Sequence, residues 1–137
     1  MSGALVAGDA DGSNRRDYQA ACPAGRRPLL VRTYGGQAVW REAGEAQRLL
    51  PLEAPIPSEG GGTIEPAAPA AQLLAFRLGS GRVLVSGDGG LFGAQMNESG
   101  AIGVNDGATG NQPFAAAALR WLLGLSSQPP SLCSQPQ

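Results

Sequence analysis

The stretch "QLLAFRLGSGRVLVSGDGG", residues 72–90, constrains the fold more than any other part of the chain. Two apolar runs meet at the sequence GSG, and glycines in so short a connection supply the positive φ angles of a tight turn. Residues 83–85 are apolar at every position, which is typical of a strand covered on both faces. We therefore predict a β-hairpin over residues 72–85, with its second strand in the centre of a sheet.

Further strands and one helix are expected around this hairpin. β-branched and aromatic residues flank two glycines in "LLVRTYGGQAVW", which predicts two short strands or one bent strand. Pro51 restricts the strand in "AQRLLPLE" to an edge or a strand end. The segment "GNQPFAAAALRWLLGL" predicts a helix with Asn111 as its N-cap. The predicted apolar stripe of this helix comprises Phe114, Ala117, Ala118, Trp121, Leu122 and Leu125.

The chain has neither histidine nor lysine, so all ten basic residues are arginines. Histidine is the usual general base near neutral pH and lysine the usual alternative amine, whereas arginine stays protonated. Mechanisms of the Ser-His-Asp, Cys-His, Ser-Lys and phosphate-loop lysine types are therefore excluded within this chain. The formal net charge is −1 and the arginines are scattered along the sequence, which disfavours a nucleic-acid partner.

Cys22 and Cys133 lie near opposite ends of the sequence and are too few to form a zinc site. We favour two free or structural thiols; the alternative is a disulfide between the two ends, which requires an oxidising compartment. The segment "GDADGSN" fails the pattern of a calcium loop, and we expect a solvated turn there. No cofactor or metal is predicted. No apolar run is long enough to span a membrane and no signal peptide is evident, so we expect a soluble chain of unknown compartment.

The segments "AFRLGSGRVLVSGDGGLFGAQ", "GVND", "GNQPFA" and "RWLLG" follow one another in an order that resembles a known family. They are similar to the C-terminal half of bacterial domains of the class I glutamine amidotransferase-like group, which are flavodoxin-like and related to ThuA-like and gliding-motility ABC-auxiliary domains. The resemblance implies an α/β fold: an open, mainly parallel sheet with a C-terminal hairpin and a packed C-terminal helix. The N-terminal strand-helix units of a complete domain are missing, and so are the catalytic residues.

On this basis the chain divides into three segments. Residues 1–28 form a polar N-terminal segment with one short strand near residues 4–7, residues 29–125 the amidotransferase-like α/β domain, and residues 126–137 a flexible tail. An incomplete domain of this type would leave a sheet edge exposed, through which it could form a homodimer or be completed by a protein partner.

Asp88 ends the second strand of the hairpin, where such folds place their ligand crevice. The favoured interpretation is structural: its carboxylate accepts hydrogen bonds from backbone amides in the following turn. In the functional alternative, Asp88 lines a site for a polar small molecule together with Asn105, Asp106 and Asn111. The leading hypothesis for the whole chain is a non-catalytic binding or interaction domain.

Two other functions remain open from the sequence. One is a carboxylate-based hydrolase, with or without a metal, in which Asp88 and Asp106 converge across a cleft. The other is an extracytoplasmic carbohydrate-binding module with exposed, coplanar Tyr34 and Trp40, although packing in the core is the more common role of such aromatic residues.

Overall fold

The structure is a computed structural model that describes residues 2–5, 15–58, 60–98 and 100–135. The predicted turn around residues 8–14 lies outside these ranges. The chain divides into two compact units, which we describe separately. Unit 1 comprises Met1–Asn14 and Gly35–Gly89, and unit 2 comprises Arg15–Tyr34 and Gly90–Gln137.

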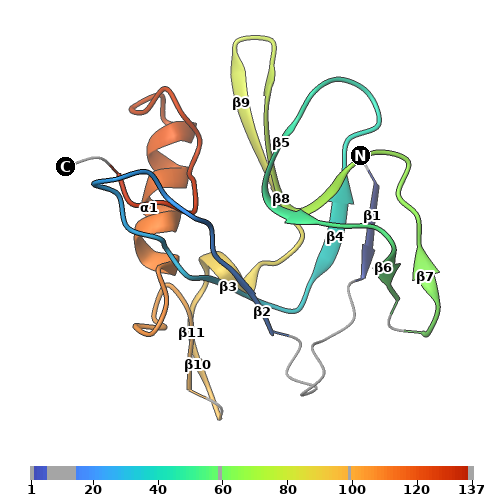
Figure 1. Cartoon of the computed structure of the whole chain (residues 1–137), viewed down its shortest axis with the longest axis horizontal. Coiled ribbons are helices and arrows are strands. Elements are labelled where there is room, and N and C mark those ends of the chain that lie inside the picture. The colour runs from blue at the N-terminus through green and yellow to red at the C-terminus, as the bar shows by residue number, and fades with distance from the viewer. Residues whose placement is uncertain (1, 6–14, 59, 99, 136–137) are drawn as a thin grey trace. The chain divides into compact units, whose positions relative to one another are not determined.

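Unit 1 contains a five-stranded sheet in which every pairing is antiparallel (Figure 1). The order is β1-β4-β8-β5, and β9 also pairs with β8. These strands are β1 (Ser2–Leu5), β4 (Gln37–Trp40), β5 (Gln47–Leu52), β8 (Ala70–Leu78) and β9 (Gly81–Ser86). A second hairpin, whose strands have two residues each, forms from β6 (Ile56–Pro57) and β7 (Thr63–Ile64). It lies in the proline- and glycine-rich segment before β8.

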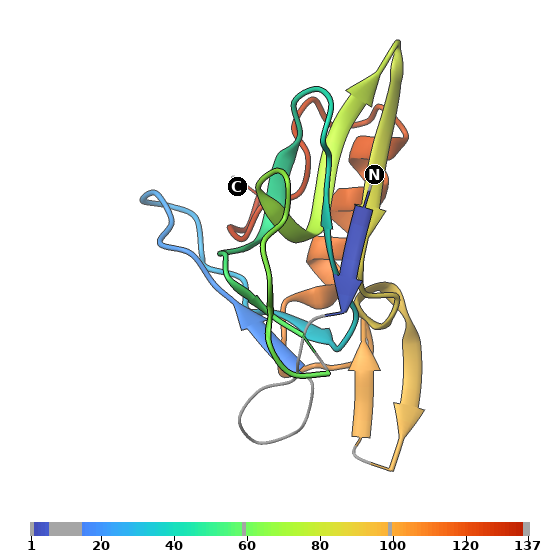
Figure 2. The ribbon, with the colours of Figure 1, turned by 90° about the vertical axis from the view of Figure 1, so that its right-hand side faces the viewer.

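The predicted hairpin is confirmed, since β8 and β9 pair from Leu73↔Ser86 to Leu78↔Gly81 around a two-residue turn. The prediction that its second strand is central is wrong: β8 is the central strand, and β9 pairs only with β8 among the described strands. The apolar residues 83–85 are accordingly half-buried. Figures 1 and 2 show the tip of this hairpin projecting past the loop that precedes β5.

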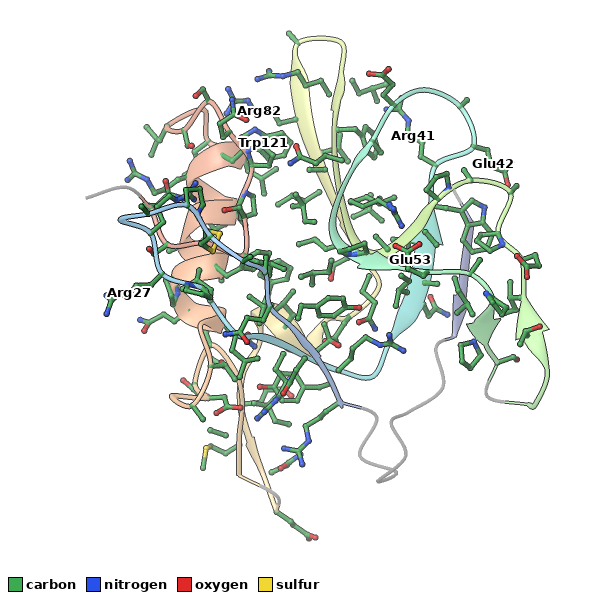
Figure 3. All side chains as sticks on the ribbon, in the orientation of Figure 1. Arg27, Arg41, Glu42, Glu53, Arg82 and Trp121 are labelled. Carbon is green, nitrogen blue, oxygen red and sulfur yellow. A yellow bond between two sulfur atoms is a disulfide. The ribbon has the colours of Figure 1, made fainter. Side chains whose placement is uncertain are left out.

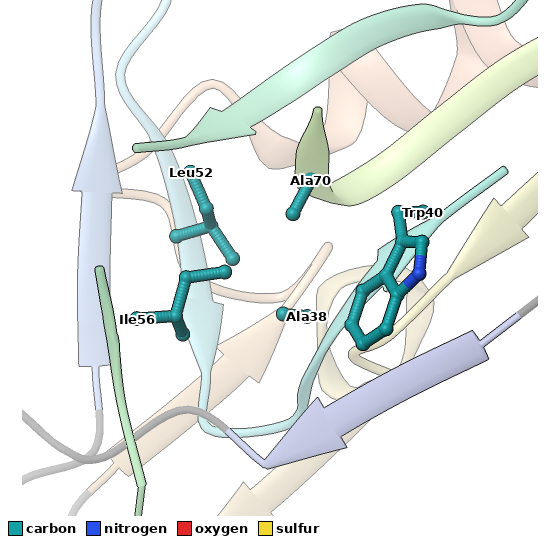
Figure 4. Packing of buried hydrophobic residues seen from close by; sticks show 5 residues of the cluster. All are labelled: Ala38, Trp40, Leu52, Ile56 and Ala70. Carbon is teal, nitrogen blue, oxygen red and sulfur yellow. The ribbon is translucent and has the colours of Figure 1, made fainter. Parts of the chain in front are cut away.

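The core of unit 1 includes a cluster around Trp40, which is only 8% exposed (Figure 4). The other members of the cluster come from β4, β5, β6 and β8, and they are Ala38, Leu52, Ile56 and Ala70. Ile56 is buried because the β6–β7 hairpin folds its apolar residue inward while its prolines and glycines form the turns. Trp40 therefore has the packing role that the sequence favoured and offers no open face for a sugar.

Unit 2 is built from short antiparallel pairs and one helix. A two-stranded sheet joins β2 (Arg15–Tyr18) to β3 (Val31–Tyr34), and another joins β10 (Ala94–Asn97) to β11 (Gly100–Gly103). The helix α1 (Asn111–Leu122) and the short 3-10 helix η1 (Gly90–Phe92) both contact β3. No helix in the described part of the chain is long and apolar enough to cross a membrane.

The predicted apolar stripe of the helix is confirmed in part, since Phe114, Ala118 and Trp121 are buried. Its buried residues are Asn111, Phe114, Ala115, Ala118 and Trp121, at helical spacing, whereas Leu122 and Leu125 are exposed. Asn111 is the first residue of the helix and not its N-cap, because its side chain is used elsewhere; Gly110 holds the cap position without a side-chain hydrogen bond. The alanine run thus predicts the helix correctly. The predicted N-cap, Asn111, and the predicted burial of Leu122 and Leu125 are wrong.

A disulfide joins Cys22 to Cys133, with Cα atoms 5.8 Å apart, so the favoured expectation of two free or structural thiols is wrong and the alternative is confirmed. Around it the C-terminal segment pairs with residues 26–29: Leu29 N donates to Leu132 O at 2.8 Å, and Ser134 N donates to Arg27 O at 2.8 Å. The Arg26 side chain donates to Ser131 and to two backbone carbonyls of this segment. Residues 131–134 of the predicted tail are therefore linked to residues 22–29 by the disulfide and by hydrogen bonds.

The predicted α/β, flavodoxin-like class is wrong. Strands make up most of the regular structure, all strand pairs are antiparallel and the described residues contain one α-helix. A parallel sheet requires a crossover of about a dozen residues between neighbouring strands, usually a helix. No helix lies between β4 and β9 in the described part of unit 1, and every strand pair of its sheet is antiparallel.

Candidate functional site

Asp88, the residue that first suggested a site, lies in unit 1 and is 4% exposed. Its backbone is held by Ser86, whose Oγ donates to Asp88 O at 2.6 Å and accepts from Asp88 N at 3.2 Å. The described residues contain no buried side-chain polar atom without a hydrogen-bond partner. Asp88 is thus a buried, partnered residue.

The glycines beside Asp88 have a packing role. A side chain at Gly36 (φ +95°) would collide with the carbonyl of Gly87, and a side chain at Gly87 would collide with the carbonyl of Gln37. The close approach permits Gln37 N to donate to Gly87 O at 2.8 Å, and Gly87 N donates to Gln72 O at 2.8 Å. The "GDGG" sequence after β9 therefore fastens the hairpin to the start of β4.

Asp106 lies in unit 2, in a network centred on Arg32. The Arg32 guanidinium donates to both carboxylate oxygens of Asp17, at 2.7 and 3.0 Å, and to Asp106 Oδ2 at 3.3 Å. Tyr34 Oη donates to the same Asp106 oxygen at 3.0 Å, and Ala108 N donates to Oδ1 at 3.1 Å. Both oxygens of Asp106 are therefore engaged within the unit.

The titration of these groups is shifted away from acid–base catalysis at neutral pH. The hydrogen bond from Arg32 lowers the pKa of Asp17, and the same hydrogen bond raises the pKa of Arg32. Burial raises the pKa of Tyr34, opposed by a hydrogen bond from the backbone of Gly103. A catalytic acid or base works best with a pKa near the working pH, and these shifts move all three groups further from it.

Asn111 connects the helix to β3. Its Oδ1 accepts from Arg32 N and its Nδ2 donates to Arg32 O, both at 2.9 Å, and the residue is completely buried. The side-chain amide thus makes the two hydrogen bonds to the Arg32 backbone that a neighbouring strand would otherwise make. Asn105, the fourth predicted site residue, is exposed. Asp106 and Asn111 both meet Arg32 in unit 2, but in structural contacts, while Asp88 belongs to unit 1.

The sequence did not point to a groove of about 940 Å³ within unit 1. Small-molecule sites have volumes of about 300–1,000 Å³. Three arginines and one glutamate contribute to its lining, which comprises Arg41, Gly44, Glu45, Ala46, Gln47, Arg48, Pro69, Ala75, Phe76 and Arg77. The groove therefore has an excess of positive charge.

Two of the three arginines are held in place by the protein. Arg41 places its guanidinium carbon 4.1 Å from the centroid of the Phe76 ring and donates from Nη1 to Glu45 O at 2.8 Å. Gly44 (φ +88°) lies against this guanidinium, and a side chain there would displace it. Arg48 donates to Leu52 O and Ala70 O and forms an ion pair with the exposed Glu53. Figure 3 shows Arg41 in the loop after β4, towards the β8–β9 hairpin.

Arg77 differs from both. It is exposed, and its side chain has no hydrogen-bond or ion-pair partner among the residues that the structure describes. The sequence contains most of the residues of this groove in two segments, "REAGEAQR" (41–48) and "FR" (76–77), which are separated by more than 25 residues. Only the pairing of β5 with β8 brings the two segments together.

No protein-family model matches this sequence, and comparisons with curated proteins and with solved structures found no match either. In the described ranges, no three histidine, cysteine, aspartate or glutamate residues come together in a way that could hold a metal ion.

Proposed function

We propose that this chain is a non-catalytic binding domain whose ligand site is the arginine-lined groove of unit 1. The observation that carries the proposal is the preorganisation of Arg41 between Phe76 and Gly44, beside an Arg77 whose side chain has no partner within the described part of the chain. A fixed guanidinium loses little conformational entropy when it binds a carboxylate or phosphate. The ligand is accordingly anionic.

The acids of the chain support a binding role rather than hydrolysis. Asp106 has both oxygens occupied by donors of unit 2, and Asp88 is buried in unit 1. Neither is presented with the open coordination that a metal or a nucleophilic water would need. The disulfide supports the further proposal that the domain works in an oxidising compartment.

The proposal is tested by titrating ¹⁵N-labelled protein with glutarate, citrate and phosphate and mapping the amide shifts. We expect saturable shifts confined to residues 41–48 and 75–77, and loss of these shifts in the double variant Arg41→Ala/Arg77→Ala. Arg120→Ala is the matched control, because it removes an exposed arginine of α1 in unit 2. Shifts that are absent, or unchanged in the double variant, would refute the proposal.

A further inference from the structure

The groove of unit 1 opens along the backbone of β8 and not over one face of the sheet. Besides Arg41 and Pro69, its lining consists of three consecutive residues of β8, Ala75 to Arg77, and of five consecutive residues leading into β5, Gly44 to Arg48. Successive residues of a strand point to opposite faces, so a groove over one face would be lined by alternate residues only. The consecutive lining places the groove at the point where the chain before β5 separates from β8.

One residue of β8 turns its backbone groups toward this groove. In an antiparallel strand, alternate residues direct their N–H and C=O to opposite sides. Gln72 O accepts from Gly87 N on the β9 side, so Arg77, five residues later, directs its N–H and C=O to the β5 side. The pairing of β5 with β8 ends at Gln47↔Ala75, and Arg77 therefore lies beyond the last paired residue on that side.

Each face of the strand has one arginine at this open position, although the exposed Glu45 also contributes to the lining of the groove. The Arg77 side chain lies on the same face as Ala75, and Arg41 stacks on Phe76, whose side chain points to the opposite face. A strand added beside Arg77 would place consecutive side chains on these two faces, each opposite one arginine. Two consecutive acidic residues would satisfy both charges.

We propose that the groove binds an extended acidic peptide segment of a partner protein, which adds to the edge of β8 at Arg77. This inference rests on the proposed function, since it specifies the ligand of the same groove. One acidic residue pairs with the backbone of Arg77 and forms an ion pair with its side chain, and the adjacent acidic residue meets the Arg41 guanidinium. Main-chain pairing gives affinity, and the charges select the sequence.

The test uses the peptide acetyl-Thr-Thr-Glu-Glu-Thr-Thr-amide, titrated calorimetrically into the full-length, disulfide-bonded protein. Three matched peptides separate the contributions: one has Gln-Gln in place of Glu-Glu, and the other two each carry a single N-methyl group, one on each glutamate nitrogen. We expect the acidic peptide to bind more tightly than glutarate. The Gln-Gln peptide should lose about tenfold or more in affinity, and one of the two N-methylated peptides a comparable amount.

The protein variants provide the second arm. Arg77→Ala removes one charge but keeps the backbone groups, so the weakening caused by N-methylation should persist in it, whereas Arg120→Ala should bind like the wild type. If the peptide binds no more tightly than glutarate and neither N-methyl group matters, the peptide inference is overturned while anion binding in the groove stands. If neither glutarate nor the peptide binds, both proposals fail.

Discussion

Replacing Asn111 by alanine tests whether the helix of unit 2 is attached to β3 through one side-chain amide. The variant removes the acceptor for Arg32 N and the donor for Arg32 O, two hydrogen bonds of 2.9 Å made by a fully buried side chain. A backbone group left without a partner in a buried site costs about 1–3 kcal/mol. Two such groups, partly rehydrated by water entering the space, predict a loss of about 2–4 kcal/mol in the free energy of unfolding.

Urea unfolding measures this loss, with the disulfide kept intact. Trp40 belongs to unit 1 and Trp121 to unit 2, so a Trp40→Phe background makes the fluorescence report unit 2 alone. The midpoint should fall with little change in the slope. Asn111→Asp should be destabilised by a similar amount, because its carboxylate cannot donate to Arg32 O.

The matched control is Asn105→Ala, which truncates an exposed asparagine of the same unit and should shift the free energy by less than about 0.5 kcal/mol. If Asn111→Ala is no less stable than Asn105→Ala, the amide bridge does not carry the attachment of the helix. The reasoning from buried hydrogen bonds would then be refuted for this site.

Three further predictions concern stability. The double variant Cys22→Ser/Cys133→Ser opens a loop whose ends are 111 residues apart, and chemical denaturation should show a loss of about 2–5 kcal/mol; an unchanged midpoint would contradict it. The pKa of Tyr34 is raised above 10.0 in the folded protein. The stabilisation that the protonated Tyr34 side chain gives the folded state is therefore complete below pH 10 and is lost as the pH rises through the raised pKa. Unfolding from about pH 9 to about pH 11 should therefore show a steeper decline in the wild type than in Tyr34→Phe. Gly87→Ala should lower the melting temperature, since its side chain would meet the carbonyl of Gln37, and a melting temperature equal to that of wild type would disprove this close approach.

The elements that the sequence predicted correctly depend on neighbours in the chain. The β8–β9 hairpin follows from two apolar runs and a glycine turn, and the helix from its alanines and apolar spacing. Position within the sheet depends instead on distant partners. The run 83–85 could belong to a central strand or to an edge strand half-covered on both faces, and only the pairing of β8 with β4 and β5 decides between them.

The predicted site residues show the same division. Asp106 and Asn111 are polar residues in glycine-rich segments, which is why the sequence predicts them as site residues, and in the structure both contact Arg32, more than 70 positions away. Their polarity was a correct sign of hydrogen bonding but could not distinguish a ligand from a backbone partner. A glycine-rich sequence indicates that the backbone turns there or that another group packs closely against it. At Gly87 that group is the backbone of Gln37 and not a ligand.

Arg32 and Arg41 differ in whether an acidic side chain neutralises their charge. Arg32 is shared by two carboxylates, which leaves its charge satisfied and its position structural. Arg41 donates to a backbone carbonyl and stacks on an aromatic ring, contacts that orient a guanidinium without cancelling its charge. With Arg77 exposed beside it, two positive charges face one groove in a chain whose formal net charge is −1. Among the residues that the structure describes, neither of these two arginines has a carboxylate partner, and this is why we propose that an acid supplied by another molecule binds them.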